Sequence, residues 1–282
     1  MMLRIGEINY LNCTPLFTSL RADFQDNGYR FVSGHPSKLN AKLRSGEVDI
    51  CPSSSIEYAQ NPDLYLILPG LSISSKGPVK SVLLFSKLPL DSLDGASIGL
   101  TGESETSVIL LKILLSLKFS FANSYYKVEE SDQGFPSGHD ALLLIGDRAL
   151  IEASKNTAGH VYDLGELWYE FTGLPFVFAL WLLRKDALSR SMEAVHLLHE
   201  RLVSSKHKAV ESLPEIAATL KQNVWTNSSF LINYWSIISY DLTEGHIEGL
   251  KLFYRYAAEC GFIESAPPLR MLEERRCHEQ SL

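Results

Sequence analysis

Hydrophobic and polar positions alternate at the start of the chain, and this pattern then changes abruptly. Residues 4–8 alternate as a short β-strand does, and the apolar positions stop at Asn9. The pair Thr14-Pro15 indicates the start of a helix, because threonine caps helices and proline is tolerated at their first position. Asn9, Tyr10 and Asn12 are therefore predicted at the carboxyl end of a first strand, where open α/β sheets bind ligands. A simpler interpretation is that these side chains only close a strand-to-helix turn.

Strand-like and helix-like segments continue to alternate through the next part of the chain. The predicted elements are strands at 29–32, 48–52, 64–71 and 81–86 and helices at 37–45 and 56–60. The strand at 48–52 ends in Ser53-Ser54-Ser55, and a small polar loop at 72–80 leads into Ser81 at the start of the last strand. Two further strand ends in this half therefore carry small polar groups.

A segment rich in Pro, Asp and Ser at 89–95 interrupts this pattern, and a second group of elements begins after it. The predicted elements are strands at 97–100 and 141–145 and an apolar helix at 107–115. A polar run at 101–107 leads into this helix, and the strand at 141–145 ends in Gly146-Asp147. Asp147 is a candidate site residue, and capping of the next helix explains it equally well.

The long apolar run at 176–183 predicts a strand that returns the chain to its first half. Helices are predicted after it at 187–204, 207–222, 228–239 and 243–260. We therefore predict an α/β protein of two lobes joined by two crossovers. Lobe I comprises residues 1–88 and 178–282, and lobe II comprises residues 89–177. Clefts between domains commonly hold small ligands, so the site is expected between the lobes.

The size and charge of the chain narrow the classes of function. Its 282 residues and 31.6 kDa are enough for two lobes, each with its own core. A net charge of −7 and a pI near 5.6, with no basic stripe, argue against a nucleic-acid partner. No apolar run approaches the roughly 20 residues that cross a bilayer, so no membrane association is predicted.

Cysteine usage and the first residues indicate a compartment. The four cysteines are Cys13, Cys51, Cys260 and Cys277. They show no C-x-x-C or zinc-like spacing, which favours reduced thiols over a disulfide framework. Residues 1–3 run directly into the first strand without the basic and apolar regions of a signal peptide. We therefore expect a cytoplasmic protein.

The polar run at 101–107 is a candidate anion site. Free N–H groups at the start of the apolar helix, with hydroxyls from Ser104, Thr106 and Ser107, suit a negatively charged group. The same residue types also fit ordinary helix capping. Together with the three polar strand ends of the first half, this run predicts a small polar ligand that carries carboxylate groups.

Other chemical signals are weak. His196 and His199 lie three positions apart on a predicted helix, but no third ligand accompanies them, so no metal site is predicted. Four aromatic residues near the C-terminus have helical spacing and are expected in the core, namely Phe230, Tyr234, Trp235 and Tyr240. The G-x-S-x-G, P-loop and G-x-G-x-x-G motifs do not occur.

Several strings, taken in order, resemble those of one enzyme family. They are INYLN at 8–12, GHPSKLN at 34–40, GEVDI at 46–50, GPVKSV at 77–82, ESETSV at 103–108, DLGE at 163–166 and TGLPFVFA at 172–179. Over about residues 3–265, the chain is similar to the chorismate dehydratases of the futalosine route to menaquinone. The start INYLN resembles this branch rather than the related 1,4-dihydroxy-6-naphthoate synthases.

The resemblance implies a type II periplasmic-binding-protein fold with a ligand cleft between its lobes. It also implies a hydro-lyase that removes water from chorismate to give 3-[(1-carboxyvinyl)oxy]benzoate, without a metal or organic cofactor. By the family's pattern, Asn12 and Ser81 fall on positions tied to catalysis. The residues expected to bind the substrate are Asn9, Tyr10, Ser53, Ser54, Ser55, Ser104, Thr106, Ser107 and Asp147.

Two alternatives accompany this interpretation. A binding protein for a small anion has the same fold and a similar site, although the missing export signal argues against it. The related naphthoate synthase is the second alternative. Turnover separates these functions, because a binding protein leaves chorismate intact whereas a dehydratase yields an aromatic product.

Overall fold

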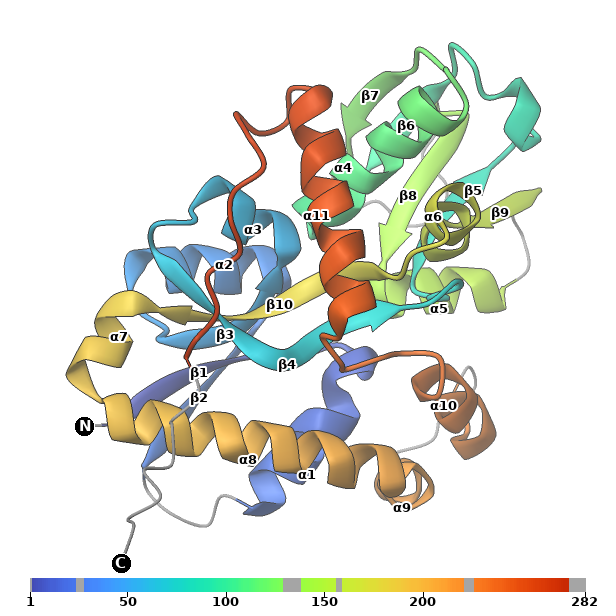
Figure 1. The fold of residues 1–282 in the computed structure, drawn as a ribbon. Helices are drawn as coiled ribbons and strands as arrows, with labels where there is room; N and C mark the ends of the chain where they lie inside the picture. The colour runs from blue at the N-terminus through green and yellow to red at the C-terminus, as the bar shows by residue number, and fades with distance from the viewer. Residues whose placement is uncertain (1, 24–27, 129–137, 156–158, 221–225, 274–282) are drawn as a thin grey trace, which may run out of the picture.

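The computed structural model describes residues 2–23, 28–128, 138–155, 159–220 and 226–273, and these form two lobes, each built on a mixed sheet (Figure 1). The first sheet has the strand order β2-β1-β3-β10-β4. Its strands are β1 (Leu3–Ile8), β2 (Tyr29–Gly34), β3 (Ile50–Ser54), β4 (Tyr65–Ser75) and β10 (Phe176–Arg184). β1 is parallel to both β2 and β3, whereas β10 is antiparallel to both β3 and β4.

The second sheet has the strand order β7-β6-β8-β5-β9. Its strands are β5 (Val82–Ser86), β6 (Ser97–Leu100), β7 (Ser124–Lys127), β8 (Ala141–Ile145) and β9 (His160–Asp163). All five residues of β8 are buried, as expected for a continuous apolar strand inside a sheet that is covered on both faces. β5 is antiparallel to both β8 and β9.

The sheet membership of β5 differs from the division expected from the sequence. The predicted boundary after residue 88 assigns Val82–Ser86 to lobe I, whereas this strand pairs within the second sheet. The break at 89–95 is therefore a connection inside the second lobe, because strands on both sides of it lie in one sheet. We propose that the two crossovers lie instead at residues 76–81 and 173–175, between β4 and β5 and just before β10.

Helices cover both sheets (Figure 1). They are α1 (Thr14–Asp23), α2 (Pro36–Ser45), α3 (Ser55–Gln60), α4 (Glu105–Ile113), α5 (Gly146–Ser154), α6 (Leu164–Thr172), α7 (Lys185–Arg190), α8 (Met192–Glu211), α9 (Leu213–Thr219), α10 (Ser228–Trp235) and α11 (Glu244–Glu259). Two short 3₁₀-helices, η1 (Leu11–Cys13) and η2 (Leu90–Ser92), and a π-helical segment after α4, η3 (Leu114–Lys118), complete the regular elements that the structure describes. α8 packs against α1, and α11 lies where the lobes meet, against β10, α3 and α4 (Figure 1).

The helices after β10 differ from those predicted. The predicted helix is interrupted at Ser191, which separates α7 from α8. α8 then continues through residues 205 and 206, where the sequence suggests an interruption. Ser205 and Lys206 are buried, and the Lys206 ammonium donates to the Gly70 carbonyl at 3.0 Å, so tertiary contacts outweigh the weak helix propensity of serine. Residues 221–222 of the predicted helix at 207–222 lie outside the described part of the chain.

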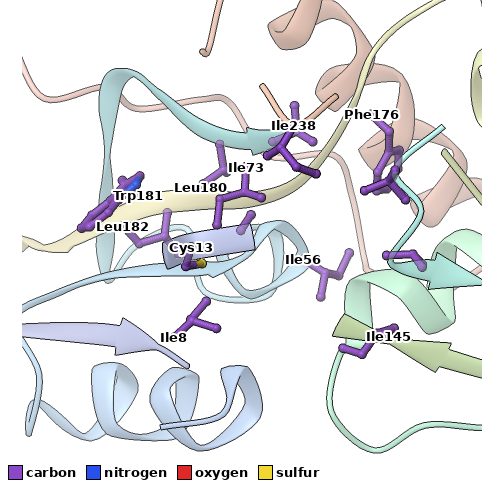
Figure 2. Close-up of a cluster of buried hydrophobic side chains, with 14 of the residues drawn as sticks. Ile8, Cys13, Ile56, Ile73, Ile145, Phe176, Leu180, Trp181, Leu182 and Ile238 are labelled. Atoms are coloured by element: carbon purple, nitrogen blue, oxygen red, sulfur yellow. The ribbon is translucent and has the colours of Figure 1, made fainter. Parts of the chain in front are cut away.

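One cluster of buried side chains extends through both lobes. It includes Ile5 and Ile50 in the first sheet and Ile98 and Leu143 in the second. Figure 2 shows part of it, with Ile8 of β1 on one side and Ile145 of β8 on the other. Because apolar contacts continue from one sheet to the other, the lobes share a common hydrophobic interior at their junction.

The cysteines that the structure describes are free. Cys13 and Cys51 are buried, and Cys260 is partly exposed. Cys277 lies outside the described residues. Within the described residues, none of the helices is both long enough and apolar enough to span a bilayer.

Candidate active site

A pocket lies between the two lobes. Both sheets contribute to its walls, through residues of β1, β3, β4, β5, β8 and β10. Its polar lining residues are Tyr10, Asn12, Ser54, Ser81, Ser104 and Ser107. Its apolar lining includes Ile8, Ile73, Val82, Ile145 and Phe178. A mostly apolar lining with a few polar groups is typical of a small-molecule site.

The turn after β1 forms the first wall of the pocket. η1 follows β1 directly, so the carboxyl end of the strand presents Tyr10 and Asn12 to the cavity. The Leu11 N–H donates to Asp147 Oδ1 at 2.9 Å, which fixes the turn against the start of α5. Gly146 has a φ of +58°, and a Cβ there would lie 3.0 Å from the ring of Tyr10, so glycine permits this close approach.

Asn12 has an unsatisfied polar atom beside the cavity. Its side-chain oxygen is buried and has no hydrogen-bond partner among the described residues. Buried polar atoms without partners are rare in folded proteins, because each loses its hydration without compensation. The geometry therefore suits a ligand group that binds the Asn12 amide.

The segment before β5 forms the opposing wall and carries Ser81. The Asp163 carboxylate accepts hydrogen bonds from the N–H groups of Val79 at 3.0 Å and Lys80 at 2.6 Å. The same carboxylate accepts from the N–H groups of Gly165 at 2.9 Å and Glu166 at 3.2 Å. Burial raises the pKa of the Asp163 carboxyl, and the hydrogen bonds from these four N–H groups oppose that rise. One carboxylate thus joins the start of α6 to the loop that leads into Ser81.

Backbone contacts complete the placement of Ser81. Lys80 has a φ of +60°, a conformation that non-glycine residues adopt only under tertiary constraint. The Gly146 N–H donates to the Ser81 carbonyl at 2.8 Å, and Ser81 is almost fully buried. A Cβ on Gly165 would lie 2.6 Å from the Gly77 carbonyl oxygen, so α6 begins in direct contact with this loop. The Ser81 backbone is therefore held in place in the pocket wall.

The start of α4 provides the remaining hydroxyls. Ser104 is the N-cap of α4, and its hydroxyl accepts from the Ser107 N–H at 3.3 Å. The Ser104 and Ser107 hydroxyls are 3.1 Å apart, and both residues line the pocket. Capping and ligand contact are therefore compatible at this helix start, although the sequence presents them as alternatives.

Thr106 joins the two lobes. Its hydroxyl lies 2.5 Å from the Ser54 hydroxyl and accepts from the Ile56 N–H at 3.1 Å. In return, the Thr106 N–H donates to Ser54 Oγ at 3.3 Å. Thr106 is fully buried and does not line the pocket. Its position indicates a structural contact between β3–α3 and α4.

Neutral groups supply the polarity of the pocket. None of the described residues that line it is a lysine or an arginine. Hydroxyls, the Asn12 amide and the N-terminus of α4 are therefore the groups available to an anionic ligand. Within the described residues, no group of three or more His, Cys, Asp or Glu side chains is arranged to hold a metal ion.

Comparison with known proteins identifies the family. The chain matches, over residues 3–259, the family described as menaquinone biosynthesis. It is 34% identical over 264 residues to the chorismate dehydratase of Thermus thermophilus, which amounts to 88% of this chain and 93% of that relative. The chain belongs to this menaquinone biosynthesis family. A chorismate dehydratase of Campylobacter jejuni is 31% identical over 192 residues, or 66% of this chain and 70% of that relative.

The fold agrees with the family assignment. A solved gene product of Candida albicans, described as having the generic periplasmic-binding-protein fold, superposes with a TM-score of 0.61 at 12% identity. That similarity covers 98% of this chain and 99% of the other chain. The two-lobed α/β architecture predicted from the sequence is therefore confirmed for this family member, with a small-molecule pocket between its lobes.

The structure brings together only part of the predicted site. Tyr10, Asn12, Ser54, Ser81, Ser104 and Ser107 line the pocket, whereas Asn9, Ser53, Ser55, Thr106 and Asp147 do not. Asn9 is exposed and borders a separate surface hollow beside Glu7 and Arg21. Ser53 is buried within β3, where successive side chains point to opposite faces. Ser55 is buried at the start of α3, and its carbonyl accepts from the Tyr254 hydroxyl at 2.6 Å.

Three residues with structural roles at the site were not predicted. Asp163 holds the loop before Ser81, and Trp235 and Tyr240 contact the turn that carries Asn12. Asp163 does carry a local signal, because an aspartate directly before a helix is a typical N-cap. The other two contacts join residues more than 200 positions apart, and the sequence has no local signal for them.

The partly buried carboxylate of Asp147 gives a prediction for stability. Burial raises the pKa of Asp147, the Leu11 N–H lowers it, and nearby Glu103 raises it further. Because the folded-state pKa exceeds the unfolded-state pKa, ionisation opposes folding above the folded-state value. An asparagine can keep an acceptor for Leu11 without the charge. We therefore expect Asp147→Asn to raise Tm at pH 7.

Thermal melts of Asp147→Asn and the unsubstituted protein between pH 3.5 and 8 check this. The gain should shrink as the pH falls and vanish below the ordinary carboxyl pKa of about 3.9, where both forms are neutral. A lower Tm for the variant at pH 7 would instead mean that the negative charge itself stabilises the turn.

The contact between the lobes gives a second prediction. Thr106→Val keeps the shape of the side chain but leaves the Ile56 N–H and the Ser54 hydroxyl without this partner. The free energy of unfolding should fall by about 1–3 kcal/mol, the cost of unsatisfied buried groups. Thr106→Ser keeps the hydroxyl and serves as the control. Urea denaturation measures both variants, and equal stability of the valine variant and the unsubstituted protein would contradict the assignment.

Proposed function

We propose that this protein is a chorismate dehydratase of menaquinone biosynthesis, which converts chorismate to 3-[(1-carboxyvinyl)oxy]benzoate and water. The observation that carries the proposal is the pocket of a family member whose polar lining includes the unpartnered oxygen of Asn12 and the hydroxyl of Ser81. The identity of 34% to the chorismate dehydratase of Thermus thermophilus supports the choice of substrate.

The chemistry of chorismate suits a pocket of neutral donors. Chorismate carries two carboxylates, which the hydroxyls and the helix N-terminus can hold. Its ring carboxylate acidifies the proton on C3 through the conjugated double bond. Loss of that proton and of the C4 hydroxyl, which leave together as water, makes the ring aromatic. The protein therefore has to orient the substrate and stabilise the developing charge, and it does not need a strong nucleophile.

We assign different roles to the two candidate catalytic residues. Asn12 binds the leaving C4 hydroxyl or the developing enolate charge, and Ser81 binds a carboxylate or relays a proton. Neither a neutral amide nor an ordinary hydroxyl has the pKa of a general base. A carboxylate of the substrate is therefore proposed as the base. The remaining pocket hydroxyls, those of Ser54, Ser104 and Ser107, are proposed to bind this carboxylate.

We further propose that the reaction needs no metal or organic cofactor and takes place in the cytoplasm. The conjugated ring carboxylate of chorismate supplies the electron-withdrawing group that the elimination needs. The structure of the substrate therefore supports a reaction without a cofactor. The free thiols of Cys13, Cys51 and Cys260 support the proposed cytoplasmic location, because reduced cysteines are typical of the cytoplasm.

Incubating the purified protein with chorismate tests the function directly. Products are separated by liquid chromatography and weighed by mass spectrometry, with and without a chelator. Loss of one water to give a substituted benzoate, unaffected by the chelator, is the expected result. Recovery of unchanged chorismate from a tight complex would indicate a binding protein. The absence of both binding and turnover would redirect the assignment to the related naphthoate synthase.

A further inference from the structure

Two hydrogen bonds tie the C-terminal part of the first lobe to the turn that carries Asn12. The Tyr240 hydroxyl donates to the Asn12 carbonyl oxygen at 2.6 Å. The Trp235 indole N–H donates to the Leu11 carbonyl oxygen at 2.7 Å. These donors lie 228 and 224 positions further along the chain than their acceptors. Two successive carbonyls of one turn are thus held by a distant segment.

The same turn is also held through its N–H group. The Leu11 N–H donates to Asp147 of the second lobe at 2.9 Å, so the turn is anchored from both lobes. Tyr240 and Trp235 do not line the pocket. Their hydrogen bonds connect them to it through the backbone carbonyls of residues 11 and 12. Their hydrogen bonds therefore act on a ligand through the turn that carries Asn12.

The polar tips of these side chains matter beyond their rings. Both residues are 2% exposed or less, so a phenylalanine could fill most of the same space. A buried hydroxyl or indole N–H is stable there only with a partner, and both have one. Burial raises the pKa of Tyr240 well above its ordinary value, so the phenol stays a neutral donor.

We propose that Tyr240, assisted by Trp235, is a positioning residue that fixes the Asn12 backbone and so aims the Asn12 amide into the pocket. The proposal rests on the function given above, in which Asn12 acts on the leaving hydroxyl or the enolate. A catalytic group must stay within about 0.5 Å of its productive position, and misplacement by about 1 Å can cost on the order of 100-fold in rate. A single carbonyl contact is therefore enough to affect turnover.

The variant Tyr240→Phe tests this by removing one oxygen atom. We expect kcat to fall by about 10- to 100-fold while KM changes by less than about threefold, because Asn12 is the one lining residue that the change is expected to displace. Tyr58→Phe is the matched control, since the buried Tyr58 hydroxyl also donates to a backbone carbonyl, that of Pro268, at 2.7 Å. Tyr58 does not line the pocket, so this control should lose stability and keep its kcat.

Crystal structures of both variants without ligand provide a readout that does not depend on activity. In Tyr240→Phe, the Asn12 side chain should be displaced by more than about 0.5 Å or lose its single orientation, and in Tyr58→Phe it should not. Trp235→Phe, which removes the donor to Leu11, repeats the experiment if Tyr240→Phe does not fold. An unchanged kcat with Asn12 in place would overturn the positioning role.

The two proposals fail in different ways. If the unsubstituted protein does not convert chorismate, the proposed function is wrong, and the position of Asn12 in the crystal structures alone decides the role of Tyr240. If the unsubstituted protein is active and Tyr240→Phe matches Tyr58→Phe in both kcat and Asn12 position, the function stands and the positioning role does not.

Discussion

Alanine at Asn12 or at Ser81 is expected to lower kcat by about 10²- to 10³-fold, the cost of removing one donor that binds transition-state charge. Chorismate binding should stay within a few-fold of the unsubstituted value. The reason lies in the timing of the charge, which develops on the ring and on the leaving hydroxyl only as the C3 and C4 bonds break. The contacts of the other pocket groups to the two substrate carboxylates exist already in the bound state, and they hold the substrate in the variants too.

Steady-state kinetics and calorimetric titration with chorismate separate the two effects. Ser86→Ala is the matched control for Ser81→Ala, because Ser86 is a buried serine at the other end of β5 whose hydroxyl donates to the Leu88 carbonyl at 2.7 Å. It should keep its kcat. Variants that lose affinity but not kcat would count against the role of Asn12 and against a proton relay by Ser81, since such residues would serve ground-state binding alone.

Local sequence signals explain which parts of the pocket can be predicted. The alternation that stops at Asn9 marks the end of β1, and a strand end is a local property of the sequence. Tyr10 and Asn12 are therefore predictable as pocket residues, and so are Ser104 and Ser107 at the start of α4. Each of these positions follows from a change of pattern within a few residues.

Ser53, Ser55 and Thr106 do not line the pocket, and the reason is geometric. Residues 53–55 form one polar run in the sequence, but only Ser54 lines the pocket. Successive side chains alternate across a strand, and the run also crosses from β3 into α3. Thr106 shares its helix turn with Ser107, yet its hydroxyl contacts Ser54 and the Ile56 N–H instead of facing the cavity. Which side chain of such a run faces a pocket depends on the neighbouring lobe.

Long-range pairing is the part of the fold that the sequence does not reveal. The apolar run at 81–86 is predicted correctly as a strand, but its partners β8 and β9 lie some 55 to 80 positions further along the chain. The C-terminal aromatic residues are similar. Their burial is expected from spacing, and Tyr234, Trp235 and Tyr240 are buried, whereas the acceptors of the Trp235 and Tyr240 donors lie in the first turn of the chain.

Asp163→Ala is expected to reduce both stability and turnover. Four backbone N–H groups from two separate segments lose their acceptor. Some of these groups are open to water after the change, so the free energy of unfolding should fall by about 2–4 kcal/mol rather than by the full sum. The loop at 79–81 also loses its attachment to α6, so kcat should fall because the Ser81 hydroxyl is no longer held in place.

Asp140→Ala separates the two effects of Asp163→Ala. The Asp140 carboxylate also holds a backbone N–H of the second lobe, that of Ser97, at 2.8 Å, and it does not line the pocket. Both variants should lose stability in urea denaturation, but only Asp163→Ala should lose kcat at a temperature where each remains folded. The kcat of Asp163→Asn should lie between those of the two alanine variants. Its carbonyl oxygen replaces one of the two carboxylate acceptors, whereas its NH₂ group faces N–H donors. Equal kcat values for Asp163→Ala and Asp140→Ala would show that the carboxylate of Asp163 stabilises the second lobe without placing Ser81.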